Sequence, residues 1–186
     1  MQTTPSNEQL GKLRDVVASY APLCLYSFLV ELEVINAGRK IGTYYTLDSV
    51  SGLPLHVWPE DIKKDYYSLC DTLPIDVLQR VFAEIHYFLI FSVAAQSSRY
   101  INIENQTRML DTLFGIFDDK TVWGTGFPSE DAFTKYRKTD NPMLVFSFHL
   151  AASVGVRDAF DVARLTTSVG DIVRSFITPS VEKIFS

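Results

Sequence analysis

Three histidines, His56, His86 and His149, are the residues of this chain best suited to acid–base chemistry or metal binding. Glu84 precedes His86 by two positions, and residues two apart on a helix point to different faces. The pair therefore cannot hold a metal from one helix, and no spacing indicates a second ligand on another element. We expect neither a metal nor a cofactor. The favoured interpretation of His86 is a core histidine that is hydrogen-bonded to a neighbour.

The carboxylates give a periodic pattern without a catalytic one. Glu104, Asp111 and Asp118 recur every seven residues, which places three acids on one helix face. Di-metal carboxylate bundles use Glu-x-x-His pairs, and the sequence contains none. Opposite charges at three- and four-residue spacing also run from Arg157 to Arg174. Such pairs are worth a few tenths of a kcal/mol and indicate solvated helix faces.

Motifs for nucleophilic catalysis or nucleotide binding are missing. There is no G-x-S-x-G sequence, and the Gly124-Thr125-Gly126 stretch has neither a third glycine nor a Lys-Ser/Thr pair. Cys24 and Cys70 lie among apolar residues and read as small hydrophobes in a reducing compartment. Catalytic groups can assemble from distant positions, so an enzyme is not excluded, but the sequence favours a non-enzymatic protein.

Large aromatic residues on predicted loops are the strongest candidates for contacts with another protein. Trp123 and Phe127 flank two glycines in one loop, and Trp58 lies in another. Tryptophan is enriched at binding hot spots, and loops carry function more often than helices. We predict these three as contact residues. The alternative for Trp123 and Phe127 is that both rings fold back onto the core.

Composition limits the class of protein. A chain of 186 residues fits one domain, 1–186, and 47% hydrophobic residues can supply a core. The net charge is −5 and no basic run exceeds two residues, so we expect no direct binding to nucleic acid or to an anionic membrane. The N-terminus does not resemble a signal peptide, and the continuous apolar runs are shorter than the ~20 residues of a membrane span. We expect a soluble, cytoplasmic protein.

Periodicity and capping signals predict a mostly α-helical, single-domain bundle of about seven or eight helices. Ser6 and Gln9 form a capping box before an apolar helical stripe, and Pro22 either kinks that helix or starts another. Further helices are expected over 59–70, 75–97, 103–117, 129–138, 142–155, 156–166 and 169–177, with Pro179 separating a short last turn. Residues 30–48 are ambiguous: alternation from Val30 to Val34 suggests a β-hairpin, whereas the unbroken apolar run before it slightly favours a helix to Ala37.

Three functional hypotheses follow. The first is a non-enzymatic regulatory protein that binds another protein through a helical, aromatic-rich surface, with a homodimer as one form of that interaction. The second is a small-molecule binder or enzyme whose aromatic pocket contains His86 and Tyr87, with His149 opposite. The third is an acidic inhibitor that blocks a nucleic-acid-binding protein.

Overall fold

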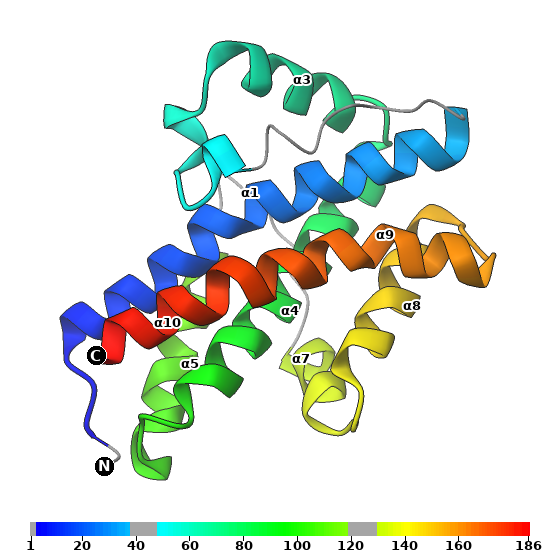
Figure 1. The fold of residues 1–186 in the computed structure, drawn as a ribbon. Coiled ribbons are helices and arrows are strands. Elements are labelled where there is room, and N and C mark those ends of the chain that lie inside the picture. The colour runs from blue at the N-terminus through cyan, green and yellow to red at the C-terminus, as the bar shows by residue number, and fades with distance from the viewer. Residues whose placement is uncertain (1–2, 38–47, 119–129) are drawn as a thin grey trace.

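The computed structural model describes residues 3–37, 48–118 and 130–186, and these residues form a bundle of eight α-helices with no strand (Figure 1). The predicted mostly helical fold is confirmed. The α-helices are α1 (Asn7–Ala37), α3 (Glu60–Cys70), α4 (Ile75–Ser97), α5 (Gln106–Phe114), α7 (Glu130–Arg137), α8 (Pro142–Val154), α9 (Ala159–Ile172) and α10 (Thr178–Phe185). Short 3₁₀ turns cover Leu55–Val57, Ile103–Asn105 and Gly115–Asp118.

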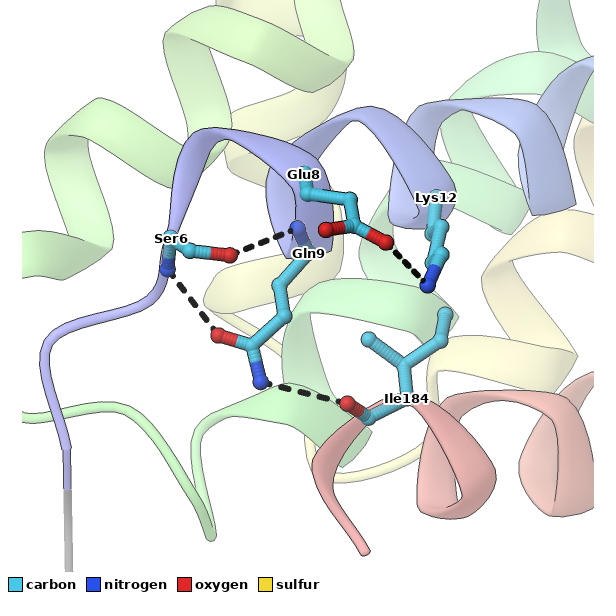
Figure 2. A network of polar contacts seen from close by, with 5 residues as sticks. All are labelled: Ser6, Glu8, Gln9, Lys12 and Ile184. Atoms are coloured by element: carbon cyan, nitrogen blue, oxygen red, sulfur yellow. Dashed lines mark hydrogen bonds and ion pairs between the residues drawn. The ribbon is translucent and has the colours of Figure 1, made fainter.

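Helix α1 begins at the predicted capping box. The Ser6 hydroxyl accepts a hydrogen bond from the Gln9 N–H at 3.1 Å, and the Gln9 side-chain oxygen accepts one from the Ser6 N–H at 2.9 Å (Figure 2). The Gln9 amide also donates to the Ile184 carbonyl of α10 at 3.2 Å. Pro22 lies inside α1 without ending it, so residues 7–37 form one helix.

The predicted β-hairpin is wrong for residues 30–37, which form the last two turns of α1. The buried residues Phe28, Leu29 and Leu32 of α1 follow the helical period. Glu31 is also buried, at an interior position of the helix. A charged residue at an interior position made the sequence look as if apolar and polar residues alternated. The other half of the predicted hairpin, residues 41–47, lies outside the described residues.

Helix α4 is the central helix of the bundle and has the predicted bounds. It packs against α1, α5, α7, α8 and α10 (Figure 1). Its second half is buried almost all round, which is why the sequence there lacks a polar face. Helix α3 was also correctly predicted: Pro59 lies at its N-terminal boundary, and acids in its first turn favour the helix dipole.

The last part of the chain is one continuous helical run rather than the predicted pair of helices and separate turn. Helix α9 passes through a π-helical turn, Val173–Ile177, directly into α10. Gly170 remains inside α9, where a Cβ would lie 2.8 Å from Cε of Met143. Pro179 lacks an N–H and would crowd the preceding turn of a regular α-helix. The wider π turn just before it gives the chain an extra residue there.

Helices α8 and α9 pack against each other with a bend of 113° between them, and local signals mark both ends of their connection. The Asn141 side chain caps α8 by accepting from the Leu144 N–H at 3.1 Å, and Gly155 ends it with a left-handed φ of 75°. Asp158 then caps α9. The Ser147 hydroxyl donates to the Thr166 hydroxyl at 2.8 Å, which fixes the register of the two helices.

Two helices of the described chain are long and apolar enough to cross a membrane: Asn7–Asn36 and Ile75–Ser97. The bent pair Pro142–Val154 and Ala159–Phe185, at 113°, satisfies the same criterion together. The prediction from the sequence considered only continuous apolar runs, and these helices are longer because they also include a few charged residues. In the bundle, 67% of the α1 window and 56% of the α4 window are buried.

A candidate protein-binding face on α8 and α9

Three large apolar side chains are exposed on α8 and α9. Leu144 is 50% exposed, Phe148 60% and Phe160 76%. Leu144 and Phe148 are four positions apart on α8 and so share one side of the helix. Phe146 and Leu150, on the other side of α8, are fully buried in the core. We call the surface formed by Leu144, Phe148 and Phe160 the α8–α9 face.

Two surface cavities lie along α9. The first, of about 440 Å³, lies between α9 and α1. Its lining residues are Glu31, Phe160, Ala163, Arg164, Thr167, Ser168 and Asp171. The second, of about 270 Å³, lies between α9 and α8 and includes Leu144 and Arg174. Ala163 and Thr167 line both cavities. Their side chains are small, so they project little from α9 between the two cavities.

Charged side chains surround this face. Arg164 Nε lies 2.6 Å from Glu31 Oε2 and so links α9 to α1. Asp171 forms an ion pair with Arg174 three positions later, in solvent. The Ser168 hydroxyl is buried and has no hydrogen-bond partner among the described residues. The face thus combines exposed aromatic rings, a surface of small residues and charges of both signs.

Trp58 does not lie on an exposed surface, contrary to its predicted role. It is 2% exposed, and its ring nitrogen donates to the Leu53 carbonyl at 2.9 Å. Tyr26 and Tyr66 contact its ring edge-on, with centroids 6.1 and 5.7 Å away. The sequence placed it on a loop, but that loop lies over α1 and α3 and buries the indole. Trp123 and Phe127, the other two predicted contact residues, lie outside the described residues.

The predicted pocket residues lie in different surroundings. His86 is buried, its Nδ1–H donates to the Phe82 carbonyl at 2.9 Å, and burial lowers its pKa to about 4. Tyr87 is also buried, with its ring centroid 5.1 Å from that of Phe117. His149 is exposed on α8. The three do not line either cavity beside α9, and the described residues contain no group of three or more His, Cys, Asp or Glu that could hold a metal ion.

A polar cluster between α4 and α7 has no sequence signal. Lys135 Nζ lies 2.7 Å from Glu84 Oε1, and the Tyr136 hydroxyl donates to the same carboxylate. Burial, together with the adjacent Glu84 carboxylate, raises the pKa of Tyr136, so this hydroxyl stays protonated. Phe88 and Phe91 contact the Tyr136 ring. Since these partly buried side chains satisfy one another, the cluster acts as a link between the two helices.

The described residues thus form a helical bundle with an exposed apolar surface, the α8–α9 face. In comparisons with protein-family models, curated proteins and solved structures, nothing matches the chain. Its function must therefore be inferred from the geometry.

Proposed function

We propose that this chain is a non-enzymatic regulatory or interaction domain that binds another protein through the α8–α9 face. The observation that carries the proposal is the exposure of Phe148 and Phe160 on two adjacent helices. Fully burying one such ring stabilises a complex by about 1.5–3 kcal/mol. Aromatic anchors beside cavities and charged groups are typical of binding hot spots.

The charges around the face would orient the partner. Arg164 lies four positions after Phe160, and Asp171 and Arg174 follow along α9 and the π turn, so this surface presents charges of both signs. Complementary charges at an interface contribute more to specificity and association rate than to affinity. The overall charge of −5 does not decide the partner, because the face itself is mixed.

Site-specific photo-cross-linking in the native host tests this proposal. A benzophenone amino acid at position 148 should cross-link to a protein, whereas the same probe at Ile75, which is somewhat more exposed and lies on α4, should not. Phe148→Ala with Phe160→Ala should abolish the product seen with a probe at Leu144, and Ile75→Ala should leave it unchanged. No product from position 148, or equal products from both positions, would contradict the proposal.

Trp123 and Phe127 remain proposed as additional contact residues. In the sequence they flank Gly124-Thr125-Gly126, in the segment that precedes α7. Trp123→Ala and Phe127→Ala should weaken the same cross-linked complex without changing the melting temperature. A complex of unchanged yield with both substitutions would remove these two residues from the contact surface.

We further propose that α1 and α4 are core helices of a soluble, cytoplasmic protein. One acid of each helix pairs with another helix of the bundle: Glu31 with Arg164, and Glu84 with Lys135. In a membrane both helices would lose the packing that buries most of each apolar window. Flotation with liposomes of host lipids should leave the protein in the bottom fraction. Recovery in the floating fraction after a carbonate wash would contradict this localisation.

A further inference from the structure

The outer surface of α9 and of the π turn after it carries a stripe of exposed residues at the spacing of a helix–helix seam. Phe160, Arg164, Thr167, Asp171 and Arg174 are all exposed and are four, three, four and three positions apart. We call this stripe the α9 seam. An average spacing of 3.5 residues keeps side chains in line along a helix and is the repeat by which two helices pack together. The opposite, inward side of α9 has its own buried stripe, including Val162, Leu165 and Val169.

The charges of the α9 seam are complementary to those of the α9 seam on a second copy in the antiparallel orientation. Arg164 lies three positions before Thr167, and Asp171 lies three positions after Ser168. A two-fold axis between Thr167 and Ser168 would therefore bring Arg164 of one copy opposite Asp171 of the other, twice by symmetry. Both residues lie on the α1 side of the seam, along the 440 Å³ cavity. In an antiparallel pair related by a two-fold axis, the α1 side of one seam lies next to the α1 side of the other. Arg164 of one copy can therefore contact Asp171 of the other.

The same axis accounts for the other members of the seam. Arg174 of one copy lies within one position of Phe160 of the other, where a guanidinium can stack on an exposed ring. Thr167 meets its symmetry mate at the centre, and Ala163 beside it is also small, so the two helices can approach closely. The Arg164 side chain is 40% exposed, so its guanidinium can reach a second carboxylate at the surface while it stays paired with Glu31.

A parallel pairing has the opposite electrostatics. It would place each residue against its own copy, so Arg164 would face Arg164 and Asp171 would face Asp171. Like charges in direct contact are unfavourable, whereas the antiparallel arrangement replaces both repulsions with attractions. The sequence of charges along the seam therefore selects one orientation.

From these relationships we infer that the partner that covers Phe160 and the α9 side of the α8–α9 face is a second copy of this chain, docked with the two α9 helices antiparallel. The inference rests on the proposed function and names its partner. Helix α9 has 14 residues and is about 21 Å long. A contact of this length across two helices falls near the lower end of specific interfaces, roughly 600 Å² per copy. We expect a dissociation constant in the micromolar range.

Analytical ultracentrifugation over a concentration series tests the dimer. The wild-type chain should convert reversibly from 21.0 kDa to twice that mass. Thr167→Glu places two carboxylates at the centre and should weaken the dimer at least tenfold. Thr107→Glu, the same change at an exposed position of α5, should leave it unchanged. Both variants should keep the wild-type melting temperature at concentrations where the chain is monomeric.

The orientation is tested with single cysteines in a Cys70→Ser background and a short bis-maleimide. Thr167→Cys should form a cross-linked dimer. Phe160→Cys should not, because in an antiparallel pair the two residues at position 160 are about 22 Å apart along the helix axes. Mixing Phe160→Cys with Arg174→Cys should restore cross-linking between the two different chains.

Three results would overturn the inference: a wild-type chain that stays monomeric up to millimolar concentration, a dimer that Thr167→Glu does not weaken, or efficient cross-linking of Phe160→Cys to itself. A monomeric chain that still gives a cross-linked product with a different protein from position 148 would overturn the self-association and leave the proposed function standing. A chain with neither product would overturn both.

Discussion

The Glu31 carboxylate and the Arg164 guanidinium, 133 positions apart in sequence, meet at 2.6 Å between the second half of α1 and the middle of α9. The two partners are unequally buried. The Glu31 side chain is 6% exposed and that of Arg164 40% exposed. The carboxylate therefore depends on the pair for its stability in the interior, whereas the guanidinium can still reach water.

This asymmetry predicts unequal effects of the two substitutions. Arg164→Ala should lower the free energy of unfolding by about 3 kcal/mol, because it leaves a buried carboxylate without its cation. Glu31→Gln should cost only about 1 kcal/mol, because a neutral amide remains and Arg164 can turn to solvent. Urea unfolding at low micromolar concentration, where the chain is expected to be monomeric, measures both. Equal losses would show that the burial of Glu31 does not set the cost.

Glu84 should contribute strongly to the packing of α7 on α4. Glu84→Ala removes the acceptor of both the Lys135 ammonium and the Tyr136 hydroxyl, and we expect a loss of about 3 kcal/mol in urea unfolding. Asp76→Ala is the matched control, because its ion pair with Arg80 lies on the same helix but in solvent. Its loss should stay within about 0.5 kcal/mol. Similar losses for the two variants would contradict the role of this partly buried cluster as a link between α4 and α7.

His86 should make the fold sensitive to mild acid. Its pKa is about 4 in the folded chain and near 6.5 when exposed, so the unfolded state takes up the proton first as the pH falls. The contribution to stability is fully present above pH 6.5 and declines between pH 6.5 and 4, by about 2 kcal/mol at pH 5. His86→Asn can keep a donor to the Phe82 carbonyl and should remove this part of the pH dependence. Identical slopes between pH 7 and 5 for both proteins would contradict the prediction.

Two glycines should respond to alanine in opposite directions. At Gly11, inside α1, an added Cβ has no atom within 4 Å, so Gly11→Ala should stabilise the fold by about 0.5–1 kcal/mol through helix propensity. Gly155 ends α8 with φ at 75°, and Gly155→Ala should cost about 1 kcal/mol because L residues are strained there. Melting temperatures that move in the same direction for both variants would contradict this explanation.

Much of the fold could be predicted from local signals. Proline and acidic residues marked the starts of α3 and α4, and the apolar period of α4 identified it as the central helix. The errors came from tertiary context. Burial of Glu31 against Arg164 produced an apparent alternation in α1, and the π turn before Pro179 let α10 continue from α9. Neither feature is visible in a window of neighbouring residues.

The candidate site was harder to predict than the helices. The charges at Arg164, Asp171 and Arg174 were expected on a solvated helix face, and Asp171 and Arg174 are exposed there. Nothing in the sequence indicated that Phe160 is exposed, since an apolar residue near the start of a helix is normally expected in the core. Only the packing of α9 shows that this ring points outward. Trp58 is the reverse case, a loop aromatic that tertiary contacts bury.

The contact between Gln9 and Ile184 brings the first turn of α1 and the last turn of α10 to the same end of the bundle (Figure 1). Ring stacking of Tyr100 on Phe185, with centroids 5.0 Å apart, holds α10 there as well. A short peptide joining the two ends of this chain would therefore span little distance, and the backbone could be opened instead between α3 and α4. Such a circular permutant would keep the contacts of α1 with α9 and α10 while changing which helix leaves the ribosome first.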